Sequence, residues 1–350
     1  MNRRTMRGLF RTVLALGALF VLAACAKDAP QDALDPAGPV AQSQHNLFMV
    51  TFWIATGVFI FVEGLIVFAA IKFRDHKNRE EPKQVHGNTR LEFTWTLIPA
   101  LILAGLAVPT VLSIFDLSAS AEPEDVHVTV TAKQWWWEYE YTNVGETSVI
   151  TANEMVVPTG RRVFLDLEST DVIHSFWVPR LAGKQDVVPG RTNTLHFTAP
   201  DEGNYEGQCA EFCALSHANM RLRVRAVSPA EFDRWVREQQ AAAAEPTDPD
   251  AIAGKQLFAD GDLLGNANVC ISCHAIRGFP EASGRIGPDL THFASREMFA
   301  GYILETNEQN VHDWIRNTRA LKPGVQMPVF EGLLTDEQIR QLTAYIMSLE

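Results

Sequence analysis

Cysteine is scarce in this sequence, with five among 350 residues. An odd, small number in an exported chain argues against a framework of disulfide bonds. Positive charge is also in the minority, with 30 lysines and arginines against 42 acidic residues and a net charge of −12. This balance argues against nucleic-acid binding, which needs a basic face. It fits either a solubilised surface or the attraction of a basic protein partner.

The N-terminus has the pattern of a secretory signal, a basic start followed by an apolar run over residues 12–24. The run is 13 residues long, too short for a bilayer, which needs about 20. It ends in Leu-Ala-Ala-Cys25, which resembles a bacterial lipobox. We therefore predict a signal peptide over residues 1–24 and lipidation of Cys25, followed by an exported segment over residues 25–46. The alternative is an ordinary signal peptide with an incidental cysteine.

Two longer apolar segments predict a transmembrane hairpin over residues 47–118. Residues 47–71 carry a single charge, Glu63, and residues 93–115 carry none. The outer flanks of the hairpin are acidic, whereas the loop between the segments is basic. The basic residues of that loop are Lys72, Arg74, Lys77, Arg79, Lys83 and Arg90. The positive-inside rule places this loop in the cytoplasm, with both termini outside a bacterial plasma membrane.

Residues 119–227 predict an exported β-sandwich or barrel, since short alternating segments are separated by Pro and Gly. Soft metal ligands gather near its end: Cys209, Cys213, His217 and Met220, with His174 further upstream. Thiolate, imidazole and thioether together point to copper.

The ligand set has one thiolate more than a mononuclear blue-copper site. Two thiolates can bridge two copper ions, each capped by a histidine, with Met220 and a backbone carbonyl as weak outer ligands. A disulfide between Cys209 and Cys213 and a Cys2His2 zinc site are the alternatives. Neither explains Met220.

This segment resembles the CuA loop of cytochrome c oxidase subunit II. Residues 134–141, 171–176 and 188–191 also resemble that family, and the likeness extends over roughly residues 45–226. Trp136 departs mildly from the family pattern. The resemblance implies a cupredoxin-like barrel. Its implied copper ligands are His174, Cys209, Glu211 through its carbonyl, Cys213, His217 and Met220.

The resemblance also implies three further roles. Trp135 would be the site of electron entry from a cytochrome, Glu92 would lie near the mouth of a proton channel, and the Glu211 carboxylate would help to bind magnesium at the border with oxidase subunit I. The alternatives are core packing for Trp135 and a solvated charge at a helix end for Glu92.

Residues 228–250 predict a linker, with a polar helical stretch and then a mixture of Ala and Pro. The domain over residues 251–350 contains Cys270-Ile-Ser-Cys273-His274, the attachment motif of haem c. The two thiols add to the haem vinyl groups, and the histidine reaches the iron. The domain resembles class I cytochrome c, which implies an all-α fold.

The second axial ligand of the haem iron should be a Met or His further along the chain. We predict Met327, because it lies in an irregular loop that can reach across the haem. The weaker candidates are Met298, Met347, His292 and His312.

Together these patterns predict the electron-entry subunit of a proton-pumping cytochrome c oxidase, without the oxygen-reducing site. Its donor would be cytochrome c or a cytochrome bc1-type protein, and its partners the other oxidase subunits. A nitrous oxide reductase would need a large His-rich domain that the sequence lacks. A copper chaperone would need neither Met220 nor a haem, and a quinol oxidase subunit would lack Cys209 and Cys213.

Overall fold

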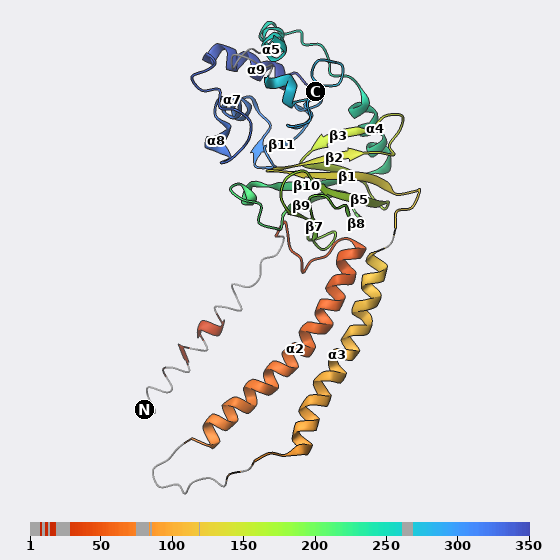
Figure 1. The fold of residues 1–350 in the computed structure, drawn as a ribbon, viewed down its shortest axis with the longest axis vertical. Helices are drawn as coiled ribbons and strands as arrows, with labels where there is room; N and C mark the ends of the chain where they lie inside the picture. The colour runs from red at the N-terminus through yellow and green to blue at the C-terminus, as the bar shows by residue number, and fades with distance from the viewer. Residues whose placement is uncertain are drawn as a thin grey trace.

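The protein is described by a computed structural model. It describes residues 29–74, 84, 86–118, 120–260 and 269–350, and short stretches at residues 8, 11–12 and 15–18. Most of the expected signal peptide, Cys25 and half of the basic loop lie outside these residues. Three parts follow one another along the long axis of the molecule: a helical hairpin, a two-sheet β domain and a small helical domain (Figure 1).

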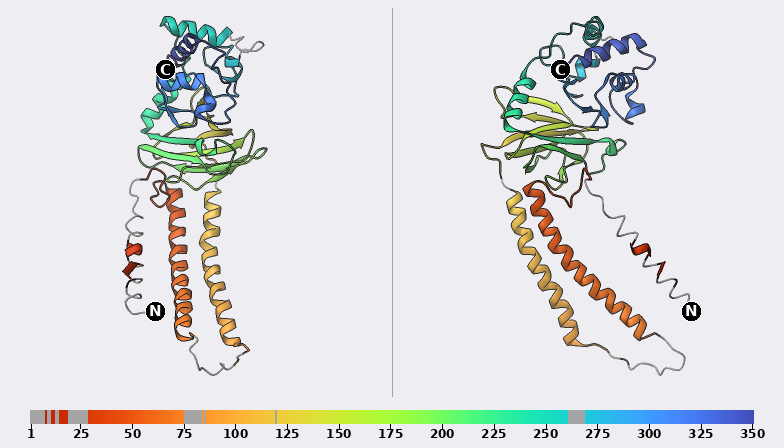
Figure 2. Two further views of the ribbon diagram at one scale, coloured as in Figure 1. Left: turned by 90° about the vertical axis from the view of Figure 1, so that its left-hand side faces the viewer. Right: turned by 180° about the vertical axis from the view of Figure 1, so that it is seen from behind.

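The hairpin consists of α2 (Pro39–Lys72) and α3 (Thr89–Leu117), which extend side by side from the β domain (Figure 2). Both are long and apolar enough to cross a membrane, and at 1.5 Å per residue they measure roughly 51 and 44 Å. Their apolar side chains are largely exposed, as expected for helices that face lipid or another membrane subunit. The two predicted spanning segments lie inside these helices, so this prediction is confirmed.

The β domain is a sandwich of two five-stranded sheets, ordered β3-β2-β1-β5-β8 and β4-β10-β9-β6-β7. Its strands are β1 (Val126–Lys133), β2 (Trp136–Tyr141), β3 (Val149–Ala152), β4 (Glu154–Pro158), β5 (Arg162–Ser169), β6 (His174–Trp177), β7 (Gln185–Val187), β8 (Asn193–Thr198), β9 (Gly203–Cys209) and β10 (Arg221–Val227). β1 alternates strictly between buried and half-buried residues, the pattern of a strand with one face on a core. The predicted barrel-like β fold is confirmed.

Part of the expected linker is a helix that belongs to the β domain. α4 (Pro229–Gln240) starts with Ser228, whose side chain accepts a hydrogen bond from the backbone N–H of Glu231. Its Phe232 and Val236 join the core of the β domain. Residues 241–248 then connect it to the next helix.

The C-terminal domain is mainly helical, as predicted. Its elements are α5 (Pro249–Asp260), α6 (Val269–Cys273), β11 (Met298–Phe299), β12 (Leu304–Glu305), α7 (Glu308–Arg316), α8 (Thr318–Leu321) and α9 (Asp336–Met347). α5 and α9 cross closely at Gly254, where a Cβ atom would lie 2.0 Å from the carbonyl oxygen of Gln341. The domain lies on the side of the β sandwich opposite the hairpin (Figures 1 and 2).

Candidate metal centre and haem site

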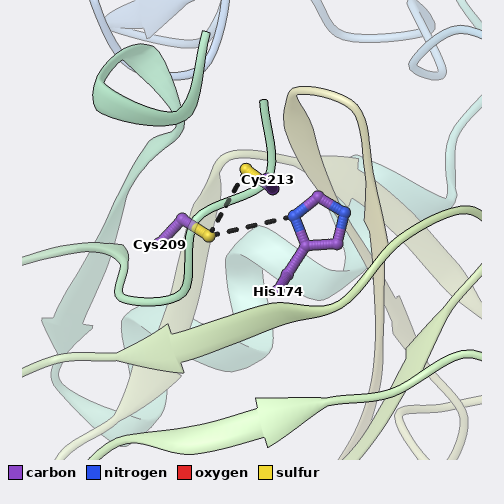
Figure 3. A group of neighbouring side chains, drawn as sticks. All are labelled: His174, Cys209 and Cys213. Atoms are coloured by element: carbon purple, nitrogen blue, oxygen red, sulfur yellow. Dashed lines mark hydrogen bonds between the residues drawn. The ribbon is translucent and has the colours of Figure 1, made fainter. Parts of the chain in front are cut away.

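The sulfur atoms of Cys209 and Cys213 lie side by side at the end of the β sandwich. Their Sγ atoms are 3.8 Å apart, far longer than the roughly 2.05 Å of a disulfide, and both thiols are free. The Nδ1 atom of His174 lies 3.8 Å from the sulfur of Cys209 (Figure 3). All three residues are buried. Each of the two sulfurs can therefore face a metal ion instead of the other sulfur.

Three more donor atoms complete the group, each beside one of the sulfurs. The Nδ1 atom of His217 lies 3.6 Å from Cys213 Sγ, and the Met220 thioether lies 3.9 Å from the same sulfur. The carbonyl oxygen of Glu211 lies 3.3 Å from Cys209 Sγ. The five side chains and the one backbone carbonyl that the resemblance implied as copper ligands thus converge on one place. The thioether beside a thiolate pair fits copper better than zinc, so these residues fit the two-copper group.

The loop that carries these ligands is fixed at both ends. Cys209 is the last residue of β9, and the short helix η1 (His217–Asn219) leads directly into β10. The backbone N–H of Cys209 donates to the carbonyl of Met220 at 2.9 Å, which closes the loop. His174 is the first residue of β6, the neighbour of β9. Adjacent strands therefore bring together ligands that are 35 positions apart in the chain.

Asp171 sets the orientation of the first histidine, a role that the sequence reasoning did not assign. Its Oδ1 lies 2.8 Å from Nε2 of His174, which leaves Nδ1 facing Cys209. Burial opposes ionisation of Asp171, but bonds from His174 and from the backbone N–H groups of Val172 and Gln134 outweigh it and lower the pKa of the carboxyl. Carboxylates that hold a ligand histidine in this way tune metal sites. An acidic residue three positions before His174 was the available sequence signal.

The thiol pair favours an ionised sulfur. The hydrogen bond from Cys213 lowers the pKa of Cys209 well below its usual value, although burial opposes this. A thiolate is the form of cysteine that binds metals.

Trp135 lies between the ligand loop and the helical domain. Its indole N–H donates to the carbonyl of Cys213 at 2.6 Å, and only 5 % of the residue is exposed. A Cβ atom at Gly324 would lie 2.6 Å from Cη2 of this ring. The ring therefore contacts both the copper loop and the other redox domain, while its role in electron entry stays a prediction.

The haem attachment motif is presented by a single helical turn. Cys270 and Cys273 lie in α6, and His274 follows with its Nδ1 2.7 Å from the carbonyl of Pro288. Burial lowers the pKa of His274, which favours the neutral imidazole. With Nδ1–H directed to Pro288, Nε2 is free for iron, as a proximal haem ligand requires. These residues fit a covalently bound haem c.

Met327 lies in a loop against the core of this domain, and its carbonyl accepts a hydrogen bond from Thr318 Oγ1 at 3.1 Å. His292 is a poorer candidate for the iron, because its ring nitrogens lie 2.7 Å from the carbonyl of Glu350 and 3.2 Å from that of Ala241. Met298 is in β11 and Met347 in α9. Met327 stays the predicted second ligand.

Glu92 lies in the first turn of α3, where its Oε1 accepts a hydrogen bond from the backbone N–H of Asn88 at 3.2 Å. This contact gives Glu92 a capping role at the helix start. Its proton-channel role, like magnesium binding by the Glu211 carboxylate, stays a prediction.

Comparison with known proteins agrees with the three parts of the molecule. Residues 28–112 match the family described as cytochrome c oxidase subunit II, transmembrane domain, and residues 145–227 match its periplasmic domain. Residues 251–350 match the cytochrome c family.

Individual proteins show the same likeness. Cytochrome c oxidase subunit 2 of Alkalihalophilus pseudofirmus is 39% identical over 336 residues, covering 94% of each chain. The protein of the same name from Bacillus sp. strain PS3 is 39% identical over 348 residues, again covering 94% of each. A solved structure of the periplasmic domain of cytochrome oxidase subunit II from Bradyrhizobium japonicum is 33% identical, with a TM-score of 0.33, covering 35% of this chain and 97% of its own.

Proposed function

Because the chain belongs to the cytochrome c oxidase subunit II family, we propose that it is the electron-entry subunit of its oxidase. Electrons would pass from a haem c in its C-terminal domain to a CuA centre and then to the haem of subunit I. Oxygen would be reduced to water in subunit I, with proton pumping. The observation that carries the proposal is the convergence of the six donor groups around Cys209 and Cys213 in the same chain as the haem motif.

The protein's contribution is to hold these groups rigidly. When bound, the two coppers and the haem supply one-electron redox chemistry. Cys209, Cys213, His174 and His217 would hold the two coppers through sulfur and nitrogen, and Met220 and the Glu211 carbonyl would be the weaker ligands. A set of ligands held on two strands and one closed loop, with His174, Cys209 and Cys213 buried, restricts geometric change between oxidation states, which favours fast transfer.

Donor, placement and processing form the finer part of the proposal. The donor would be cytochrome c or a cytochrome bc1-type protein, attracted by the acidic surface. Both redox domains would lie on the outer side of the plasma membrane, because the hairpin loop is basic and its outer flanks are acidic. Cleavage before Cys25 and its lipidation would add a second anchor. Mass spectrometry of the purified N-terminus tests the last point, and an unmodified Cys25 would contradict it.

Metal analysis and electron paramagnetic resonance test the copper assignment. We expect two coppers per chain and a mixed-valence signal in which one unpaired electron is shared by both ions. A single copper per chain, or zinc, would contradict the proposal. Co-purification with a haem-copper subunit I tests the assignment to an oxidase complex.

A further inference from the structure

The helical domain inserts a buried lysine into the β domain beside the copper loop. Lys322 follows α8 and is only 2 % exposed. Its Nζ donates to the carbonyl of Trp135 at 2.5 Å and to the carbonyl of Ala300 at 2.7 Å. One lysine side chain therefore joins the backbone at Trp135, next to the copper ligands, to the loop of the haem domain that contains Ala300.

Burying this ammonium group is costly, which argues that the contact is specific. Burial lowers the pKa of Lys322 to about 7, since desolvation disfavours the charged form. Lysine is among the residues that are almost never fully buried without a partner. Here the partners are two backbone carbonyls, one from each domain.

The loop that receives Lys322 has an unusual backbone. Ala300, Gly301 and Tyr302 all have positive φ angles, of 56, 78 and 63°. Such angles are unfavourable for residues other than glycine and persist only where surrounding contacts enforce them. The turn aims the carbonyl of Ala300 at Lys322 and the carbonyl of Gly301 at the backbone N–H of Arg221, 2.9 Å away at the start of β10.

Further contacts surround this point on the same face. The Ser216 hydroxyl donates to the carbonyl of Pro323 at 2.6 Å, next to Gly324, whose backbone lies against the Trp135 ring. At the rim, Arg285 pairs with Glu138 and Glu140, at 2.9 Å each. Exposed ion pairs such as the one to Glu140 contribute little, so the buried contacts determine how the domains are held.

We propose that Lys322 is a latch that holds the haem domain on the copper domain over Trp135 and closes this face of the copper site to any other protein. The latch rests on the proposed function, because it fixes the position of the haem domain relative to the copper ligands. Lys322 is a positioning residue and touches neither predicted cofactor ligand set through its own hydrogen bonds. The Trp135 ring then receives electrons from the chain's own haem domain.

Amide hydrogen exchange of the full-length, cofactor-loaded protein tests the latch, because the N–H of Arg221 is protected only while it donates to Gly301. Lys322→Met keeps an unbranched side chain that is one atom shorter, and removes the amino group and its charge. Losing hydrogen bonds from a charged group should raise the opening equilibrium, and hence the exchange rate of this amide, by roughly tenfold. Arg319→Gln removes one positive charge from an exposed position of α8, the helix that Lys322 follows. The Nε–H of Arg319 makes only a long contact of 3.4 Å to the carbonyl of Val325, so this variant should leave the rate unchanged.

A second variant changes the loop that accepts a hydrogen bond from Lys322. A Cβ atom at Gly301 would lie 2.3 Å from Lys322 Nζ and 2.6 Å from the carbonyl oxygen of Asn219, so Gly301→Ala should raise exchange at Arg221 as Lys322→Met does. Gly332→Ala is its control, because Gly332 also has a positive φ, but among the described residues no atom lies within 4 Å of its added Cβ. If Lys322→Met fails to fold, faster exchange of the Arg221 amide in Gly301→Ala than in Gly332→Ala supports the latch, and equal exchange in the two overturns it.

Copper and haem content, measured on the same samples, distinguish a failure of the latch from a failure of the proposed function. Intact cofactors with unchanged Arg221 exchange in Lys322→Met and Gly301→Ala would overturn the latch and leave the proposed function standing. Wild-type protein without two coppers and a haem would overturn the proposed function. Faster exchange in both variants, with the two controls unchanged, supports the latch.

Discussion

Gly287 is the sharpest test of how the haem domain holds its histidine ligand. A Cβ atom at this position would lie 2.5 Å from Cε1, 2.8 Å from Nδ1 and 3.0 Å from Nε2 of His274. The ring cannot simply turn away, because Nδ1 is bonded to the carbonyl of Pro288 and the residue is partly buried. Gly287→Ala must therefore displace the imidazole or the backbone that carries it.

The cost follows from the contacts. Overpacking a core position costs about 1–3 kcal/mol, and losing the bond between His274 and Pro288 adds about 1 kcal/mol. For a domain of this size, that sum of about 2–4 kcal/mol should lower the melting temperature by at least about 8 °C. Because the displaced ring is also the predicted iron ligand, the low-spin haem spectrum should weaken in the same variant.

Thermal unfolding monitored at the haem absorption, with electron paramagnetic resonance of the oxidised protein, measures both effects. Gly332→Ala serves as the control, since the positive φ at this position strains an alanine but no atom of the described residues lies within 4 Å of the added Cβ. It should lose some stability and keep the haem spectrum. A Gly287→Ala protein that melts within a few degrees of wild type with an unchanged spectrum would refute the reasoning.

Three further predictions concern single side chains. Bonds from Arg162 lower the pKa of Asp125. The stability that this carboxylate contributes is therefore complete above its unfolded pKa of about 3.9 and is lost as pH falls through the lower folded pKa. In denaturation curves, Asp125→Asn should lose less stability than wild type on acidification, and an identical acid dependence would contradict this. Asp171→Asn should weaken copper retention roughly 10–100-fold in chelator competition, because His174 loses its carboxylate partner, and unchanged retention would argue against that role. Met327→Leu should alter the spin state of the ferric haem while the covalent attachment persists, and an unchanged spectrum would remove Met327 as a ligand.

The sequence alone predicted most of what is local in this molecule. Cys209, Cys213, His217 and Met220 occupy one loop, and the haem motif is continuous, so residue type and spacing were sufficient to select them as candidates. The Glu211 carbonyl was named only through the family resemblance. The apolar runs that form α2 and α3 are equally local signals. His174 is separate in sequence, and its selection depended on the resemblance and on its chemistry.

The contacts between domains could not be predicted in this way. Lys322 and Trp135 are 187 positions apart, and no periodicity in the sequence reports which surface of one domain covers the other. Lysine in a turn normally indicates an exposed position. The helix α4 is an intermediate case, because Phe232, Trp235 and Val236 have the spacing of one helical face. That pattern was a signal that the first part of the linker packs on the β domain.

The connection between the two redox domains also sets the effective concentration of the haem domain at its docking face. Residues 241–248 can span at most about 28 Å when fully extended, so a haem domain released from its docking face stays close to it. Short tethers of this kind give an effective concentration on the order of millimolar. A separate protein competing for the face over Trp135 would need to approach that concentration to occupy it. Redocking is also a unimolecular step, so dilution of the protein leaves it unaffected.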